Sequence, residues 1–352
     1  MTAVVDQKFI AETPARAVAM WLFAVAALVA MMIVIGGVTR LTDSGLSMVE
    51  WRPWRGLLPP LSTLEWQRVF ELYQQSPEFQ QLNFWMSLDD FKTIFWWEFI
   101  HRVWGRLIGL AFVVPLLWFW VRGALPAQLK PRLIVLLLLG GSQGVIGWWM
   151  VKSGLVDDPA VSQYRLATHL LMAILILGVL LWTALDARGQ RIRAANAGRL
   201  STLVCFCLLI MTIGAGALVA GLDAGLAYNT FPLMDQQIVP PGYFTLAPWW
   251  LNMLENTAAV QFNHRLLAVL AAAAIISNGI YLGYTSWAPA TRLWAKLSAA
   301  LAGLQFLLGV AVLLLAVPVS LGALHQFTAV ALFAAMIALL HGLFNGHGSA
   351  GR

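Results

Sequence analysis

Charged residues are scarce in this sequence. Asp, Glu, Lys and Arg make up 11% of its 352 residues, whereas a soluble globular chain carries roughly a quarter. Hydrophobic residues make up 60% and gather in apolar runs of about 20 residues, the length that crosses a membrane as a helix. The composition therefore excludes an ordinary soluble domain and predicts a polytopic membrane protein. The net charge of +6 would suit a nucleic-acid partner, but the basic residues lie where membrane topology places them, so we expect no nucleic-acid binding.

Cysteine is also nearly absent. The two cysteines, Cys205 and Cys207, lie two residues apart in one apolar run, so on a helix they point to different faces. This arrangement excludes a disulfide between them and a shared metal site. We interpret both as small apolar residues of a helix.

Eight membrane spans are expected, and the positive charge of the loops predicts their orientation. Loops 122–132 and 185–199 carry three and four Lys or Arg residues, whereas loop 222–256 carries none. Because positively charged loops stay in the cytoplasm, we expect a multi-pass protein of the cell inner membrane with both termini in the cytoplasm. The predicted spans are 17–39, 95–121, 132–151, 164–184, 200–221, 258–284, 292–315 and 319–343.

The two halves of the chain resemble each other. The aligned segments are 35–47 with 215–227, 98–102 (EFIHR) with 261–265 (QFNHR), and 140–147 with 302–309. Each half holds four spans, an even number, so both halves enter the membrane in the same direction. We therefore predict an all-α fold of two parallel four-helix bundles, residues 1–190 and 191–352, related by a pseudo-two-fold axis along the membrane normal.

Four of the six histidines lie near the predicted outer ends of the even-numbered spans. They are His101, His169, His264 and His325. Two facing helices that each present an imidazole at one level can hold a planar metal macrocycle. A single histidine in a membrane helix can instead form a hydrogen bond between helices, but four at equivalent positions favour ligands. We therefore expect a haem iron between His101 and His169 and another between His264 and His325, both near the periplasmic face.

The charges beside these histidines differ between the halves. Arg102 and Arg265 follow equivalent histidines and could pair with haem propionates, or they could extend towards the membrane interface; both interpretations stay open. Glu98 precedes His101, whereas the second half carries Gln261 at that position. A carboxylate beside only one pocket predicts proton-coupled chemistry in the first half. The alternative is that Glu98 is a structural partner of Arg102 or Arg106.

Two further patterns lie outside the proposed haem sites. In the first outer loop, Leu64, Val69, Leu72 and Tyr73 predict a short amphipathic helix that lies on the interface as a lid. The remaining histidines, His341 and His347, have no partners of the kind described above, and we assign them no function.

Together these residues resemble the haem A synthases of cytochrome oxidase assembly, specifically the mitochondrial-type branch. The segments that carry the resemblance are GGVTRLTDSGLSMVEWRPWRGLLPPL (36–61), EFIHRVWGR (98–106), LGGSQGVIGWWMVKSGL (139–155), AGLDAGLAYNTFPLMD (220–235), ENTAAVQFNHR (255–265) and LGALHQ (321–326). The resemblance implies that the position-8 methyl of haem O is oxidised by successive hydroxylations to a formyl group, giving haem A. It also implies that His264 and His325 hold a haem b cofactor, that His101 and His169 hold the substrate, and that Glu98 takes part in catalysis. Some members carry a cysteine pair in an outer loop, which this chain lacks.

Two other functions use some of the same features. A membrane b-type cytochrome that passes electrons between quinol and a partner needs the same four histidines but no chemistry on haem. A solute transporter needs a polar path at the midplane, whereas the ionisable groups here gather near one face. The expected partners are haem O and the lipid bilayer; a haem O synthase, an electron donor and a second copy of the chain stay open.

Overall fold

The computed structural model describes residues 2–50, 55–155, 159, 161–189, 198–286 and 288–345. Within them, regular structure is helical apart from one isolated bridge between Met234 and Gln237. Eight helices are long and apolar enough to cross a membrane, which confirms the predicted number. They are α1 (Thr2–Leu41), α3 (Leu88–Val121), α4 (Lys130–Gly154), α5 (Gln163–Arg188), α6 (Arg199–Gly221), α8 (Thr257–Thr285), α9 (Pro289–Leu314) and α10 (Val319–Asn345). Most of the basic loop 185–199, and His347, lie outside the described residues.

Capping residues fix where two of these helices begin. Ser87 and Asp90 form a reciprocal capping box, so α3 begins at Leu88 rather than at the predicted residue 95. Glu98 therefore lies about three turns inside the helix and not in its opening turn. Asn256 accepts hydrogen bonds from the backbone N–H groups of Ala258 and Ala259, which starts α8 at Thr257.

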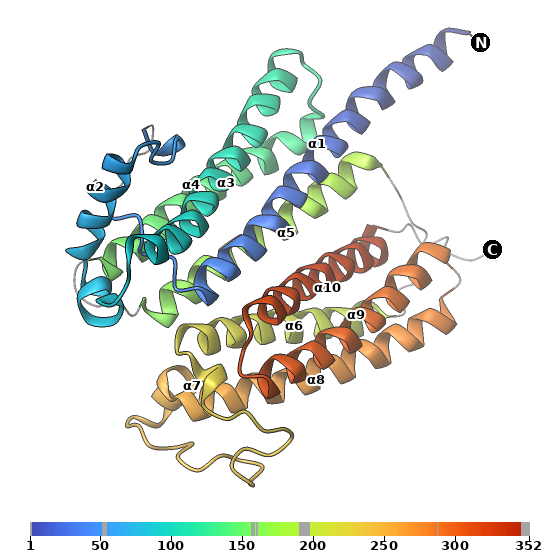
Figure 1. The fold of residues 1–352 in the computed structure, drawn as a ribbon. Coiled ribbons are helices and arrows are strands. Elements are labelled where there is room, and N and C mark those ends of the chain that lie inside the picture. Colours follow the sequence, from blue (N-terminus) through green and yellow to red (C-terminus); the bar gives the residue numbers. More distant parts are fainter. Residues whose placement is uncertain are drawn as a thin grey trace.

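The long helices form two groups that meet along a central layer (Figure 1). In the first half, α1 packs against α3 and α5, and α4 packs against α5; in the second half, α8 packs against α6 and α9, and α10 packs against α9. The groups meet where α1 and α5 contact α10, and where α5 contacts α6. The boundary at residue 190 and the pseudo-two-fold axis stay predictions.

Helices α4 and α9 expose apolar side chains. Leu138 and Val145 on α4 and Leu307 on α9 are each more than 60% exposed, while α10 is the most enclosed of the eight spans. A surface of this kind would be an aggregation hazard in water and fits contact with lipid tails. Cys205 is buried and Cys207 exposed, which confirms that they point to different faces.

The shorter helices lie at one end of the molecule. α2 (Thr63–Gln74) and α7 (Asn252–Glu255) are at the end opposite to the start of α1 and the end of α10 (Figure 1). α2 is amphipathic as predicted, but its Tyr73 is fully buried and stacks on Phe91 of α3 with ring centroids 5.0 Å apart. The helix is therefore held to α3 by an aromatic cluster.

Polar contacts join the two halves at this end. Arg40 at the end of α1 pairs with Asp43 at 2.6 Å and with Asp223 of the second half at 2.7 Å. The two aspartates are equivalent in the predicted repeat. The Tyr164 hydroxyl of α5 donates to Glu255 at 2.7 Å. These contacts join α1 to the turn after α6, and α5 to α7.

Candidate functional site

Each of the four predicted ligand histidines packs against a glycine of the preceding membrane helix. A Cβ atom placed on any of these glycines would lie between 3.0 and 3.4 Å from the nearest imidazole atom. Larger side chains there would displace the rings. The pairs are Gly36 with His101, Gly147 with His169, Gly216 with His264 and Gly309 with His325. The same local packing therefore recurs four times.

The histidines come together in the predicted pairs. His101 of α3 and His169 of α5 lie within electrostatic range of each other, and so do His264 of α8 and His325 of α10. All four side chains are partly buried. Each half of the molecule thus holds two imidazoles from different helices, which is the donor set of a bis-histidine haem site.

The ring nitrogens of these histidines also fit iron ligation. His264 donates from Nδ1 to the carbonyl oxygen of Thr212 at 3.2 Å, an arrangement that fixes the ring and leaves Nε2 for a metal. The Nδ1 atoms of His169 and His325 are buried and have no hydrogen-bond partner within the described part of the chain. A buried polar atom without a partner is unusual and points to a missing neighbour.

A glutamine lies beside the second histidine of each pair. The Gln143 side-chain amide is 3.4 Å from His169 Nε2, and the Gln305 amide is 3.2 Å from His325 Nε2. These two glutamines are equivalent in the predicted repeat. The alignment of the two halves of the chain pairs these glutamines, but only the structure places them against the histidines.

Glu98 is a buried carboxylate with both oxygens hydrogen-bonded. Its side chain is 2% exposed. Oε2 accepts from the Ser47 hydroxyl at 2.7 Å and from the Met48 backbone N–H at 2.6 Å, and Oε1 pairs with Arg102. The interpretation of Glu98 as a partner of Arg102 is therefore confirmed as a contact. It does not exclude a catalytic role, because His101 lies less than one turn further along the same helix.

Arg102 and Arg265 hold the loops after α1 and α6 by equivalent contacts. Arg102 donates to the carbonyl oxygens of Met48 at 2.9 Å and Glu50 at 3.4 Å. Arg265 donates to those of Tyr228 at 2.6 Å and Thr230 at 2.8 Å. The acceptors follow the aligned segments 35–47 and 215–227 at matching positions. Each arginine therefore fixes the chain that leaves the first helix of its half, and propionate binding stays a prediction.

Gln261 donates a hydrogen bond to the loop after α6, whereas Glu98 accepts one from the loop after α1. Its side-chain amide donates to the Tyr228 carbonyl at 3.1 Å, and its buried Oε1 has no partner within the described residues. Glu98 instead accepts from the N–H of Met48. The two sites thus share a scaffold, but at this position the first has a carboxylate, which can take up a proton, and the second has an amide, which cannot.

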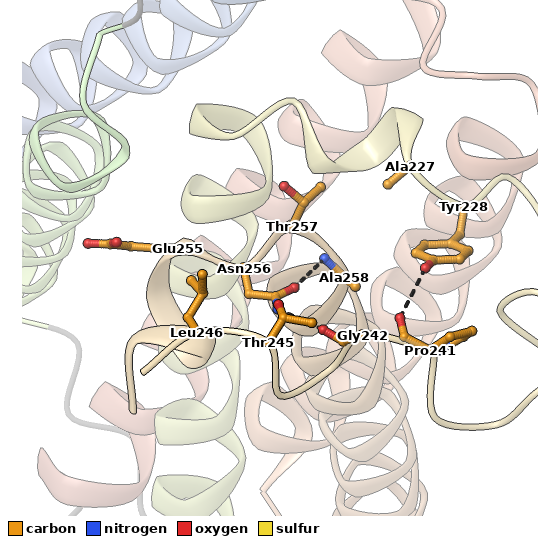
Figure 2. A pocket seen from close by; sticks show the side chains of 10 residues that line it. All are labelled: Ala227, Tyr228, Pro241, Gly242, Thr245, Leu246, Glu255, Asn256, Thr257 and Ala258. Atoms are coloured by element: carbon orange, nitrogen blue, oxygen red, sulfur yellow. Dashed lines mark hydrogen bonds between the residues drawn. The ribbon is translucent and has the colours of Figure 1, made fainter. Parts of the chain in front are cut away.

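Two cavities border the outer ends of the sites. A cavity of about 70 Å³ beside Arg102 is lined by apolar side chains and by the charged residues Arg68, Arg106, Glu50 and Glu65. A second, of about 450 Å³, lies between the loop after α6 and the start of α8. Figure 2 shows Tyr228 in its wall, with its hydroxyl donating to the Pro241 carbonyl at 3.4 Å, and Asn256 capping α8. The first cavity is the more basic one and lies beside the Glu98–Arg102 pair.

Comparisons with known proteins assign the chain to a family. A family model described as cytochrome oxidase assembly protein matches residues 19–337. This chain belongs to the cytochrome oxidase assembly protein family. Similar members are the heme A synthases of Nitrosospira multiformis (46% identical over 96% of this chain and 96% of the relative), Maricaulis maris (49%; 93% and 96%) and Parvibaculum lavamentivorans (46%; 93% and 94%).

The sequence did not indicate one polar cluster, which lies near the end of α10. His341 Nε2 lies 2.8 Å from Asp186 Oδ1, and Asp186 also pairs with Arg132. The His341 ring meets Trp182 edge-on, with centroids 5.1 Å apart. The residues come from α4, α5 and α10, so no local spacing could have brought them together.

Proposed function

We propose that this chain acts as a haem A synthase, which oxidises the position-8 methyl group of haem O to a formyl group. The observation that carries the proposal is the buried Glu98 carboxylate one turn before His101, with Gln261 at the equivalent position of the other half. The names and extensive coverage of the relatives support it. Two haem-type sites of which only one has an acid fit an enzyme that holds one haem permanently and modifies another.

The two sites divide the work in this proposal. His264 and His325 hold haem b as the cofactor, with Gly216 and Gly309 making room for their rings. His101 and His169 hold the haem O substrate, and the basic cavity beside Arg102 accommodates negatively charged substituents. When bound, haem supplies the oxygen and electron chemistry of the hydroxylations.

Glu98 handles protons next to the substrate. Each hydroxylation and the final loss of water require protons to move at the substituent being oxidised. The Arg102 guanidinium stabilises the negative form of the Glu98 carboxylate, while Ser47 and the Met48 N–H fix its orientation. A carboxylate held in this way can accept a proton or orient a water molecule.

The membrane setting follows from the loops. We place the protein in the cell inner membrane with both termini in the cytoplasm and the haem sites near the periplasmic face, because the loop at residues 222–256 has no Lys or Arg. A haem O synthase, an electron donor and a second copy of the chain are candidate partners.

Pigment analysis of purified variants tests the assignment of the sites. His264→Ala should lose haem b, whereas His101→Ala should retain haem b and lose bound haem O. Haem extracts from cells supplied with haem O should contain formyl haem only when all four histidines are present. Haem b without any formyl haem in the wild-type extract would favour the electron-carrying cytochrome instead.

The Glu98 role has its own test. Glu98→Gln should bind both haems but form haem A roughly 100-fold or more slowly, the lower range for loss of a general acid or base. A variant that loads normally and makes haem A at the wild-type rate would exclude this role.

A further inference from the structure

Helix α1 contacts the proposed sites of both halves through adjacent glycines. Gly36 packs against His101: a Cβ there would lie 3.4 Å from Nε2. Gly37 faces α10, and a Cβ there would lie 1.5 Å from Gln326 Oε1. The Gln326 side chain therefore occupies the space that any larger residue at position 37 would need.

A hydrogen bond fixes this contact. Gln326 donates from Nε2 to the backbone carbonyl oxygen of Ile33 at 2.9 Å. Ile33 lies one helical turn before Gly37, so the amide docks on the turn that precedes the two glycines. Gln326 is also the residue directly after His325. Bonded or closely packed atoms thus run from His325 through Gln326 and the glycine turn to His101.

The equivalent interface lacks this polar contact. The α5–α6 contact corresponds to α1–α10 in the predicted repeat. There, Ala217 takes the place of Gly37, and Leu170, directly after His169, takes the place of Gln326. The link thus exists on one side, from the second histidine of the proposed haem b site to the first histidine of the proposed substrate site. A purely architectural contact gives no reason for this difference.

We propose that Gln326 and the Gly36–Gly37 turn form the electron-transfer link between the two haem sites, an inference that rests on the proposed function. With haem bound at both sites, the link would pass one electron from the ferrous haem held by His264 and His325 to the haem held by His101 and His169, once oxygen has oxidised the latter to the ferric form. The donor would become ferric and the acceptor ferrous, and no proton would be transferred. Electron tunnelling falls steeply with distance and is better supported by bonded and hydrogen-bonded atoms than by gaps, so the amide strengthens the coupling.

Two substitutions break the link from opposite sides. Gln326→Leu removes the amide at similar volume and introduces the residue found at the equivalent position. Gly37→Ala keeps the Gln326 side chain, but the added Cβ pushes its amide away from α1. The matched controls are Thr328→Val, whose buried hydroxyl bonds only within α10, to the Leu324 carbonyl at 2.9 Å, and Gly109→Ala, where an added Cβ meets open space.

The measurement is the rate at which haem b is oxidised. Purified protein loaded with both haems is reduced anaerobically with dithionite and mixed with oxygen, and the haem b band is followed by stopped-flow absorbance. We expect Gln326→Leu and Gly37→Ala to slow this oxidation several-fold, with unchanged haem b content and reduction potential. The controls should match wild type.

Three outcomes overturn the link. One is a wild-type oxidation rate in Gln326→Leu with both haems bound. Another is an equal slowing by Gln326→Leu in a His101→Ala background, where the acceptor site is disabled and no further effect is expected. If Gln326→Leu lowers haem b content, Gly37→Ala decides, and a normal rate there overturns the inference. Failure of wild-type protein to bind haem b through His264 and His325 would instead refute the proposed function.

Discussion

Glu98 and Arg102 form a buried ion pair across one turn of α3, with side chains that are 2% and 11% exposed. Arg102 also donates to the Met48 carbonyl, while Glu98 accepts from the Met48 N–H. The backbone N–H and carbonyl groups of Met48, in the loop after α1, are thereby both held by the same turn of α3. The acid proposed to act on the substrate is thus fixed together with the loop that covers it.

Removing the arginine of this pair should be costly. Arg102→Ala leaves the buried Glu98 carboxylate without an opposite charge. Breaking such a pair should lower the free energy of unfolding by about 3–5 kcal/mol. Arg265→Ala is the matched control, because Arg265 makes the equivalent loop contacts but pairs with no carboxylate in the structure described; it should cost about 1–3 kcal/mol. Denaturant unfolding in detergent measures both. Equal losses would show that the ion pair adds nothing to the loop contacts.

The glycines beside the histidines should control haem content site by site. Gly309→Val and Gly216→Val should lower haem b, because Cβ atoms there already approach the rings of His325 and His264 to 3.0 Å. Gly147→Val should lower substrate haem only. Haem extraction and pyridine haemochrome spectra give the amounts. Gly303→Val, where an added Cβ meets no atom within 4 Å, is the control, and a comparable loss of haem there would contradict the steric explanation.

The sequence was sufficient for the eight spans for a definite physical reason. Crossing a membrane requires about 20 apolar residues, so the eight runs are visible without any tertiary information. The repeat places His101 with His264 and Gln143 with Gln305 by alignment alone. Start points were less predictable: α3 extends to Leu88 because a capping box, and not hydropathy, sets its first turn.

Contacts between distant segments could not be predicted. Gln326 and Ile33 are separated by 293 positions, and the apolar segments around them contain no periodic signal that pairs them. The sequence left the role of Arg102 open, because a guanidinium beside a predicted haem site suits both pairing with propionates and extension towards the membrane interface. The structure shows the carbonyl contacts, which depend on how the outer loop returns to α3.

Glu78 should make stability depend on pH. This 5% exposed side chain lies between α2 and α3 and accepts from the Tyr73 hydroxyl at 2.9 Å, while Asn83 donates to that hydroxyl at 2.8 Å. Burial raises the pKa of Glu78 to about 7; the charges of Glu98 and Asp43 act in the same direction, and the Tyr73 hydrogen bond opposes them.

The direction of this pH dependence follows from which state binds the proton. The ordinary pKa of the group is 4.5, so between that value and about 7 the folded state holds a proton that the unfolded state has lost. Stability should therefore fall as pH rises through this window. Glu78→Gln should remove this part of the slope, measured by thermal unfolding at about pH 5 and about pH 8. Glu71→Gln on the exposed side of α2 should retain it, and an unchanged slope in Glu78→Gln would assign the pH dependence elsewhere.

The polar cluster around Asp186 should stabilise the end of the bundle at which α10 finishes, without affecting the proposed haem sites. His341→Phe keeps a ring against Trp182 but removes the N–H that bonds Asp186, so it should cost about 1–3 kcal/mol in unfolding free energy. His341 lies 16 residues after His325 on α10, or about 24 Å along the helix, so haem b content and its spectrum should match wild type. His341→Gln, which can still donate, should lose less stability than His341→Phe. Loss of haem b in His341→Phe at normal stability would mean that the two ends of α10 are coupled more tightly than this separation implies.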